Sequence, residues 1–429
     1  MIIGIIYDDI SRPGLDCRNP QKGNPGVGGT QFCYLMFMYY YTISFPEDKI
    51  IVYRHRQVNE YPKMPLEDKI TYKKVDSVEK CIEMASLDHV DVLLFTHNHV
   101  AALNEKITEY KIKCIVWIHN WIRGSILDLL SNNPSIRKVV FLVNEHYDRY
   151  IDHDVIKKGV IIPNMLETKG LATRDDCKQM NVTYVGAVVP GKGFDVLAKA
   201  WPKVIAEVPD AHLFVIGKGN LYGNISSFGP LGIAEESFEK KFAKYLLDDA
   251  NRVLPSVHFM GLLGGEKINI FKKTKVGVVN PSGRTEVCPI SALEMEAFEI
   301  PVVSKSTNGI PDVIVNQKTG LLVHSEREIA ASIIKLLKDN EMNSSYGAAA
   351  RVFVENSFNP HRIIKLWHEL FIRVQNGEEE KVHVNKTLLQ NDFKWIRQLN
   401  YYLKKTVLFR WLPSMINVES MISKALHGR

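Results

Sequence analysis

Short apolar runs rich in valine and isoleucine alternate with longer stretches of helical periodicity along the whole chain. Such alternation is typical of parallel sheets whose strands are joined by crossover helices. In the first half, the runs expected to form strands are 2–6, 50–53, 70–74, 91–95, 114–118 and 139–143. The pattern then restarts, with strands expected at 182–185, 212–216, 257–260, 276–279, 301–303 and 321–323. The sequence therefore predicts an α/β protein with two doubly wound lobes.

A polar stretch separates the two sets of strands. Pro163 and the charged residues of 167–179 interrupt the periodicity there, as a linker would. We expect the lobes to face each other across a cleft, because such sheets bind ligands at the carboxyl ends of their strands. The predicted organisation is an N-terminal Rossmann-like lobe at 1–165, a hinge at 166–180, a second Rossmann-like lobe at 181–358 and a helical C-terminal extension at 359–429.

Length and composition agree with a soluble two-lobed protein. The 429 residues exceed one ordinary domain of roughly 100 to 200 residues, and 45% hydrophobic with 24% charged residues describe a globular chain. The N-terminus has no basic leader, and the longest apolar stretch, 32–45, is shorter than the roughly 20 residues that cross a bilayer. Six cysteines without a C-x-x-C pair favour a reducing compartment. We therefore expect a cytoplasmic protein without a transmembrane helix.

Three glycine-bearing loops follow predicted strands and precede helices. Gly28 and Gly29 end the loop after the first strand, Lys192 lies between two glycines after 182–185, and Gly217 follows 212–216. Backbone amides in such loops can approach an anion, and a lysine adds a point charge for a phosphate. An ordinary turn or a solvated lysine also explains each loop, and none matches the Walker or G-x-G-x-x-G pattern.

Two glutamates flank the start of a helix expected after 276–279. Glu286 precedes the helix and Glu294 lies within it, while Pro289 is tolerated in the first turn and Ser291 can donate to a ligand. Carboxylates accept hydrogen bonds from sugar hydroxyls, and the first amides of a helix suit a diphosphate. By spacing alone, helix capping and surface charge explain the two acids equally well.

The stretch 286–294 resembles the E-x7-E motif of glycosyltransferase family 4, whose retaining GT-B enzymes build capsules, lipopolysaccharides and other glycans. The neighbouring segments that follow the family's order are 291–294, 300–303, 308–313 and 320–323. In the first lobe, the looser likeness rests on Gly28-Gly29, His97, His119 and 161–164. The resemblance implies a GT-B fold and transfer of a hexosyl group from a nucleotide sugar such as a UDP-sugar.

The resemblance also implies residue roles. Glu286 would bind hydroxyls of the donor sugar, Glu294 the ribose and Lys192 the diphosphate. His119 would lie near the transferred sugar, although without the family a packed or loop histidine is the more frequent explanation. The implied catalytic residues are Glu286, His119 and Lys192, and the implied donor-binding residues are Gly28, Gly29, Lys192, Gly217, Arg284, Glu286, Ile290, Ser291 and Glu294. The family needs no metal or cofactor, because cationic side chains and helix dipoles take the charge of the leaving diphosphate.

Two positions depart from the family pattern. Ala187 stands where the family commonly has an arginine, so half of the expected cationic clamp is missing, and Arg284 or Lys218 is a candidate substitute. Pro289 occupies part of the usual glycine-aromatic-glycine sequence and has no N–H to offer a phosphate. We expect a partly rebuilt phosphate cradle.

The end of the chain is basic. Residues 381–429 carry nine Lys or Arg against two acids, which leaves the rest of the chain close to neutral. Between 386 and 411, apolar residues at helical spacing alternate with the cations Lys394, Arg397, Lys404, Lys405 and Arg410. This pattern is typical of a helix in an anionic membrane interface, and a helix packed on the first lobe explains it equally well. Nucleic acid is a poorer partner, because no reader motif occurs.

The predicted function is a retaining, metal-independent transfer of a sugar from a nucleotide-sugar donor to a saccharide or lipid-linked acceptor, with peripheral attachment to the cytoplasmic face of a membrane as a further expectation. The alternative is a catalytically weak GT-B subunit that serves a glycosylation complex as a membrane- or partner-binding component. Other GT-B chemistry, such as sugar-nucleotide epimerisation or phosphorolysis, ranks below both, because neither epimerase acids nor a pyridoxal lysine context is recognisable.

Overall fold

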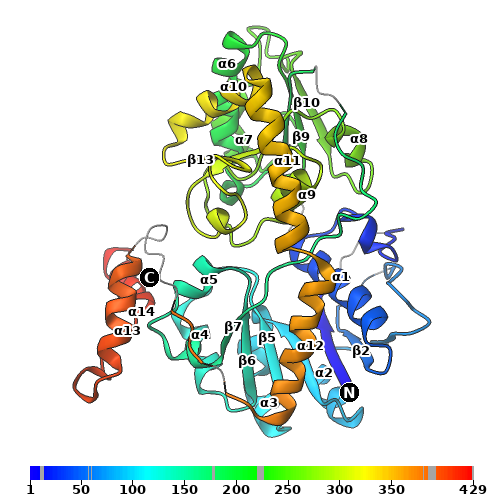
Figure 1. Ribbon diagram of the computed structural model, residues 1–429, viewed down its shortest axis with the longest axis vertical. Helices are drawn as coiled ribbons and strands as arrows, with labels where there is room; N and C mark the ends of the chain where they lie inside the picture. Colours follow the sequence, from blue (N-terminus) through cyan, green and yellow to red (C-terminus); the bar gives the residue numbers. More distant parts are fainter. Residues whose placement is uncertain are drawn as a thin grey trace. The chain divides into compact units, whose positions relative to one another are not determined.

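The computed structural model describes residues 1–9, 14–56, 58, 60–175, 179–219, 227–379, 381–384 and 393–427, with the side chains of 426 and 427 excepted. The chain forms two compact units (Figure 1). The first unit consists of Met1–Pro20, Cys33–Asn164 and Pro360–Arg429, and the second of Gln21–Phe32 and Met165–Asn359. Part of the predicted hinge, 176–178, and the start of the predicted membrane segment, 386–392, lie outside the described residues.

The first unit is built on a seven-stranded sheet in which every pair of neighbours is parallel. Its strand order is β3-β2-β1-β4-β5-β6-β7. The strands are β1 (Ile2–Tyr7), β2 (Lys49–Arg54), β3 (Thr71–Lys74), β4 (Val92–Thr96), β5 (Cys114–Trp117), β6 (Ile136–Phe141) and β7 (Gly159–Ile161). The central strands are continuous apolar runs rather than alternating ones, because crossover helices bury a parallel sheet on both faces.

Helices of the first unit follow its strands in βα order and continue at the end of the chain. They are α1 (Gly29–Ser44), α2 (Val78–Leu87), α3 (Val100–Glu109), α4 (Gly124–Asn132), α5 (Asn144–Asp148), α12 (Pro360–Asn376), α13 (Lys394–Lys404) and α14 (Met415–His427), with the short 3-10 helices η2 (His97–His99) and η9 (Val407–Phe409). The division between the two units falls inside α1.

The longest apolar stretch of the sequence is α1. Within the first unit its Phe37 contacts the rings of Trp117, Trp367 and Phe371, which lie on β5 and α12. A helix that is apolar all round belongs in a protein core. Among the described residues, no helix combines the length and the apolar character needed to cross a membrane.

The second unit holds a six-stranded parallel sheet in the order β10-β9-β8-β11-β12-β13. Its strands are β8 (Asn181–Val185), β9 (His212–Ile216), β10 (Val257–Gly261), β11 (Val276–Val278), β12 (Val302–Lys305) and β13 (Gly320–Val323). Its helices are α6 (Phe194–Glu207), α7 (Glu236–Phe242), α8 (Lys267–Phe271), α9 (Ile290–Ala297), α10 (Ile329–Lys338) and α11 (Asn340–Ser357), with η4 (Pro190–Lys192) before α6.

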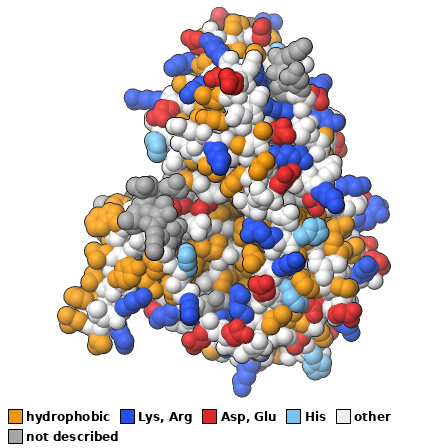
Figure 2. Space-filling view, in the orientation of Figure 1, with side chains coloured by type: hydrophobic (Ala, Val, Ile, Leu, Met, Phe, Trp, Pro, Cys, Tyr) orange, Lys and Arg blue, Asp and Glu red, His pale blue; other side chains and the backbone are white. Residues whose placement is uncertain are grey.

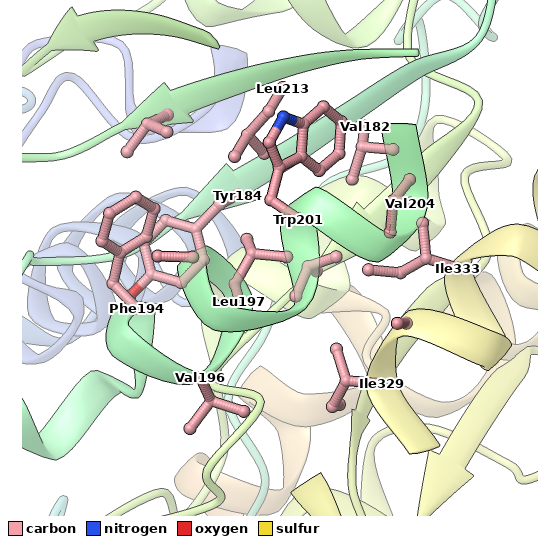
Figure 3. Packing of buried hydrophobic residues seen from close by; sticks show 14 of the residues in the cluster. Val182, Tyr184, Phe194, Val196, Leu197, Trp201, Val204, Leu213, Ile329 and Ile333 are labelled. Atoms are coloured by element: carbon pink, nitrogen blue, oxygen red, sulfur yellow. The ribbon is translucent and has the colours of Figure 1, made fainter. Parts of the chain in front are cut away.

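A large apolar core lies beside this sheet (Figure 3). Leu197 and Trp201 of α6 belong to this core together with Val182 of β8 and Ile333 of α10, and all four side chains are fully buried. The indole N–H of Trp201 donates to Ser256 Oγ at 3.1 Å, which satisfies its one polar atom. This core fixes the direction of α6 and with it the loop between β8 and α6.

The predicted fold class is confirmed, and all twelve predicted strands are present within a few residues of their predicted ends. The sequence pattern did not predict β7, a three-residue edge strand at Gly159–Ile161. Its shortness and the closely following Pro163 make this stretch resemble a linker. In both sheets the strand order reverses beside the first strand of the unit, at β1/β4 and at β8/β11.

The cations of α13 are turned toward the first unit. Lys394 is 1% exposed and forms ion pairs with Asp148 at 2.5 Å and Glu145 at 3.3 Å. Arg397 is fully buried and pairs with Glu419 of α14. The packing of α13 on the first unit is therefore the explanation that holds for these two cations, whose charges are neutralised inside the protein rather than offered to a membrane.

The opposite face of α13 is apolar and exposed, as is the segment after it. Figure 2 shows hydrophobic side chains gathered over α13 and α14. The exposed large apolar side chains of this region are Phe393, Trp395, Leu399, Tyr402, Val407, Leu408, Trp411, Met421 and Ile422. We call this set the tail face. Large exposed apolar patches are typical of surfaces that contact another protein or a membrane.

Candidate functional site

The candidate site of the second unit lies at the carboxyl edge of its sheet, where β8 and β11 are neighbours. The chain leaves β8 toward α6 on one side and β11 toward α9 on the other, and ligands of open α/β sheets bind at this switch point. The loop after β8 carries Lys192, and the loop after β11 carries Glu286. The fold thus brings together two predicted residues that are 94 positions apart.

Glu286 and Lys192 form an ion pair. The Glu286 Oε1 atom lies 2.5 Å from Lys192 Nζ, and the Glu286 side chain is 8% exposed. Asn280 holds the two loops in place, because its Nδ2 donates to Glu286 Oε1 at 3.2 Å, to Arg284 O at 2.7 Å and to Gly191 O at 3.0 Å. A buried charge is stable only with such partners, so the pair is presented in a defined geometry.

Two glycines allow these loops to approach each other. Gly193 has a φ of +66°, and a Cβ atom there would lie 2.6 Å from Ser282 Oγ. Gly217 has a φ of +144°, and a Cβ atom would collide with the carbonyl oxygen of Gly186. Both positions therefore require glycine for the backbone itself. Gly217 is a predicted donor-binding residue. In the structure it packs against the backbone of Gly186 and Ala187.

Glu294 has a lysine partner that the sequence pattern did not predict. Its Oε1 atom lies 2.7 Å from the Nζ atom of Lys267, the first residue of α8, and also accepts from the backbone N–H of Asn24 at 3.4 Å. Both side chains of the ion pair are 7% exposed. The sequence feature that could have identified Lys267 is the stretch Gly264-Gly265-Glu266-Lys267 after β10. It repeats the order of strand, glycine, lysine and helix found around Lys192.

A pocket adjoins Glu294 and Lys267. The other side chains around it are mostly apolar, and the residues that line it are Lys22, Gly23, Asn24, Leu166, Leu171, Gly265, Lys267, Ile268, Phe271, Glu294 and Phe298. The two charged side chains thus lie against a mostly apolar pocket.

The predicted glycine pair ends the segment that reaches this pocket. Asn24 shapes the segment, since its Oδ1 accepts from the N–H groups of Gly26 and Val27 at 2.9 Å each. Gly28 follows, and Gly29 begins α1. Gly28 and Gly29 therefore belong to the same unit as Glu294.

The helix α9 begins at Ile290, with Pro289 as its N-cap. The first amides of a helix have no acceptor within it, so those of Ile290 and Ser291 are available in principle to an anion. Ala292 and Leu293 already donate to the Pro289 carbonyl, at 3.1 and 3.4 Å. Because Pro289 precedes the first turn, its missing N–H removes no bond of the helix.

Arg284 lies beside the lysine loop. Its NH1 donates to Pro190 O at 3.1 Å, and its NH2 lies 3.5 Å from Glu326 Oε1, while the side chain is 47% exposed. Ala187 is buried and offers no charge. Lys218, the other candidate substitute, has its Nζ 4.8 Å from the centre of the Phe228 ring. Of the two cations, Arg284 is therefore the one that contacts the Lys192 loop.

The two predicted histidines belong to the first unit. His119 follows β5 and is buried, and burial, followed by the nearby His97 and His146, holds its pKa well below the ordinary value. Its Nε2 atom has no hydrogen-bond partner among the described residues. Burial likewise lowers the pKa of His97 to about 4, with His99 adding to the effect. Both rings are neutral at physiological pH, and His119 keeps one ring nitrogen for a ligand.

Comparison with known proteins identifies the domain that carries the carboxylates. Residues 174–353 match the family model described as glycosyl transferases group 1. This stretch contains Lys192, Lys267, Glu286 and Glu294. The second unit is thus a group 1 glycosyltransferase domain.

Curated relatives are similar over part of their length. The capsular polysaccharide biosynthesis glycosyltransferase CapM of Staphylococcus aureus is 27% identical over 44% of this chain and 44% of its own. A GDP-mannose-dependent monoacylated α-(1-6)-phosphatidylinositol monomannoside mannosyltransferase of Corynebacterium glutamicum is 30% identical over 39% of this chain and 40% of its own. The chain therefore matches less than half of the length of these two relatives.

Solved structures share the fold over most of the chain. The sucrose-phosphate synthase of Thermosynechococcus elongatus aligns with a TM-score of 0.65 and 15% identity, over 88% of this chain and all of the other. Anabaena HepE in complex with UDP-glucose aligns with a TM-score of 0.62 and 13% identity, over 87% of this chain and 99% of the other. At these identities the likeness establishes the GT-B architecture of two Rossmann-like domains.

Proposed function

We propose that this chain, which carries a group 1 glycosyltransferase domain at residues 174–353, transfers a hexosyl group from a nucleoside diphosphate sugar to a saccharide or lipid-linked acceptor with retention of configuration. The observation that carries the proposal is the presence of two ion pairs in the second unit, the partly buried Glu286–Lys192 and the buried Glu294–Lys267. Two acids and two cations, one pair on the loops after β8 and β11 and the other on α8 and α9, match a ligand that has both hydroxyls and a diphosphate.

In this proposal each ion pair divides its work between two parts of the donor. Glu286 accepts from hydroxyls of the sugar while Lys192 moves its charge toward the diphosphate. Glu294 accepts from the ribose, and Lys267 keeps its charge compensated in the pocket. The pairs position Glu286, Glu294 and Lys267 before the donor arrives, so little ordering of these three side chains remains to be done on binding.

The proposed step exchanges one bond at the anomeric carbon for another. The bond from this carbon to the β-phosphate oxygen breaks, a bond to the acceptor hydroxyl oxygen forms on the same face, and the hydroxyl proton leaves with the departing nucleoside diphosphate. Lys192, Arg284 and the first amides of α9 stabilise the charge on the leaving phosphate, which is the work of preorganised donors. Because these groups would neutralise the leaving phosphate, the proposed reaction needs no metal ion for that purpose.

The donor and acceptor classes are drawn from the comparisons. HepE is described with UDP-glucose, and the Corynebacterium mannosyltransferase is GDP-mannose-dependent, so we propose a nucleoside diphosphate donor with UDP as the first to test. CapM is named for capsular polysaccharide biosynthesis, and the mannosyltransferase for a phosphatidylinositol monomannoside. A lipid-linked acceptor would suit a protein that attaches to a membrane through its tail face.

The direct test is release of nucleoside diphosphate from a panel of UDP- and GDP-sugars in the presence of saccharide acceptors. Glu286→Gln should lower turnover at least about 100-fold, because it removes the negative charge that faces Lys192 and the proposed sugar hydroxyls. Glu207→Gln is the control, since Glu207 forms an exposed ion pair with Lys338 on the same unit. Equal rates for the Glu286 variant and the wild type would refute the assignment.

The second candidate function is a catalytically weak subunit of a glycosylation complex. Ala187 favours it, because the buried alanine cannot supply the positive charge that the family commonly places there. Such a subunit would bind a nucleoside diphosphate, shown by a raised melting temperature, and would release none from any donor. Turnover that depends on Glu286 excludes it.

A further inference from the structure

We propose that the first unit binds a divalent transition-metal ion of the zinc class through Asp8, His55 and His99. Asp8 directly follows β1, His55 directly follows β2, and His99 ends η2, which follows β4. The strand order β2-β1-β4 places these three ends side by side at the carboxyl edge of the sheet. Residues 47 and 91 positions away from Asp8 thus meet at one point.

The three side chains converge with the spacing of metal ligands. Asp8 Oδ1 lies 2.8 Å from His55 Nε2 and 3.0 Å from His99 Nε2, and the three ligand atoms lie within 4.8 Å of one another. Around a tetrahedral zinc ion, ligands at about 2.0–2.1 Å lie roughly 3.3 Å apart, so the two contacts of Asp8 would lengthen by a few tenths of an ångström to admit the ion. The two imidazole rings lie edge to face, with their planes crossing at 87°.

Asp8 supplies the negative charge of the cluster, and Arg56 is a cation nearby, with its NH1 donating to the Asp9 carbonyl oxygen at 3.1 Å. Asp9, the neighbouring acid, binds Arg54 through Nε at 2.9 Å and through NH2 at 2.5 Å, so that each neutralises the other. The Asp8 carboxylate is then the charge left to the two imidazoles. Imidazole and carboxylate together suit zinc and similar first-row ions. Among the described residues, these three form the one group of such side chains with ligand atoms this close.

The cluster is accessible, and its site would be incomplete without a further ligand. The three side chains are 13–19% exposed, which leaves an entry path for an ion. Three protein ligands leave one tetrahedral position open for a water or for an oxygen of a bound molecule. Carboxyl edges of open α/β sheets are ligand-binding positions, so the ion would lie at an edge of the first sheet where ligands bind in such folds.

The proposed metal site is separate from the donor carboxylates, which belong to the second unit. Its loss would leave Glu286, Glu294 and their lysines unchanged. Binding of a nucleoside diphosphate therefore reports on the proposed function, and metal binding reports on this inference.

The test uses the full-length untagged chain, stripped with a chelator and titrated with Co²⁺. We expect a visible ligand-field absorption that saturates at one equivalent and disappears when Zn²⁺ is added, together with a higher melting temperature in Zn²⁺. His99→Ala and Asp8→Asn should weaken Co²⁺ binding by more than about tenfold, the loss typical even of a residue that only supports a ligand. His324→Ala, which removes an exposed histidine of the second unit, is the control and should bind as the wild type does.

Near-ultraviolet circular dichroism and UDP binding show whether each variant is folded. His55→Ala is a second ligand variant if His99→Ala unfolds. Absence of the cobalt absorption from the wild type, or its persistence in folded His99→Ala and His55→Ala, would overturn the proposal.

Discussion

Lys267 Nζ lies 2.7 Å from Glu294 Oε1, and both side chains are almost completely buried. The two residues are 27 positions apart and lie on different helices, α8 and α9. A buried charge with one partner depends on that partner, so either residue removed alone leaves an uncompensated charge.

Lys267→Met is therefore expected to destabilise the protein by about 3 kcal/mol, the usual cost of breaking a buried pair. The double variant with Glu294→Gln should recover part of this loss, because no unpaired charge remains. Urea denaturation of the wild type, both single variants and the double variant measures the coupling. Under the proposed function, the double variant should bind UDP more weakly than the wild type even if its stability recovers. If it binds UDP as tightly as the wild type, Glu294 is not part of the donor site.

Arg284→Ala is expected to lower turnover at least about tenfold, with less than about 0.5 kcal/mol lost from stability. Arg284 is half exposed and contacts the lysine loop through Pro190, so its charge matters more than its packing. Rates of nucleoside diphosphate release and urea denaturation separate the two effects. Arg327→Ala, a nearby change on η8 (Glu326–Glu328), is the matched control. An unchanged rate in Arg284→Ala would show that another group compensates for Ala187.

Stability is expected to fall in acid partly through His119. Burial holds the pKa of His119 well below its ordinary value near 6.5, so the unfolded chain takes up a proton that the folded chain refuses. His119 therefore costs no stability above pH 6.5, and it lowers the free energy of unfolding progressively as the pH falls below 6.5. At pH 5 the loss from one such histidine is about 2 kcal/mol.

His119→Gln should remove this share of the pH dependence. The measurement is the free energy of unfolding of the wild type and the variant between pH 5 and 8. Parallel curves would mean that His119 is protonated in the folded protein. A loss of turnover at constant stability near pH 8 would support the place beside the transferred sugar that the family resemblance implies for His119.

Glu296→Gln is expected to stabilise the protein at neutral pH. Burial raises the pKa of Glu296 well above its ordinary value, and a hydrogen bond from Thr319 offsets only part of the effect. The unfolded glutamate ionises as the pH rises through 4.5, whereas the folded one stays protonated, so stability decreases over that range. At pH 7 the gain should be about 1 kcal/mol or more and should vanish near pH 4. The same gain at both pH values would contradict a titration origin.

The tail face is expected to bind membranes. Val407 and Trp411 are 79% and 75% exposed, and the nearby Lys405 and Arg410 are cations on the same segment. The double variant Val407→Ser/Trp411→Ser should lose most of the binding to phosphatidylglycerol-containing vesicles, measured by co-sedimentation at low and high salt. Leu87→Ser, an equally exposed apolar change on α2, is the control. If both variants bind as the wild type does, the tail face serves another partner.

Much of the fold follows from local pattern. A parallel strand needs a run such as Val92–Thr96 that is apolar on both faces, and a crossover helix needs apolar residues every three to four positions, so neighbouring residues encode both. Local pattern does not single out Glu286, Glu294 and Lys192 in the same way, because capping and solvated charge explain their spacing equally well. The resemblance of their stretches to a family motif makes them candidates. The edge strand β7 is too short to leave such a pattern.

Only the tertiary structure decided which of these residues meet. Strand order places Lys192 on Glu286, Lys267 on Glu294, and the Asp8 carboxylate between His55 and His99, and no local periodicity encodes a contact across 27 to 94 residues. The same holds for α13, where the sequence determined an amphipathic helix but not its orientation. Lys394 pairs with a buried acid of α5 and Arg397 with Glu419 of α14, so these cations face the first unit and each charge has an oppositely charged partner in place of water. The apolar side of α13 is therefore exposed.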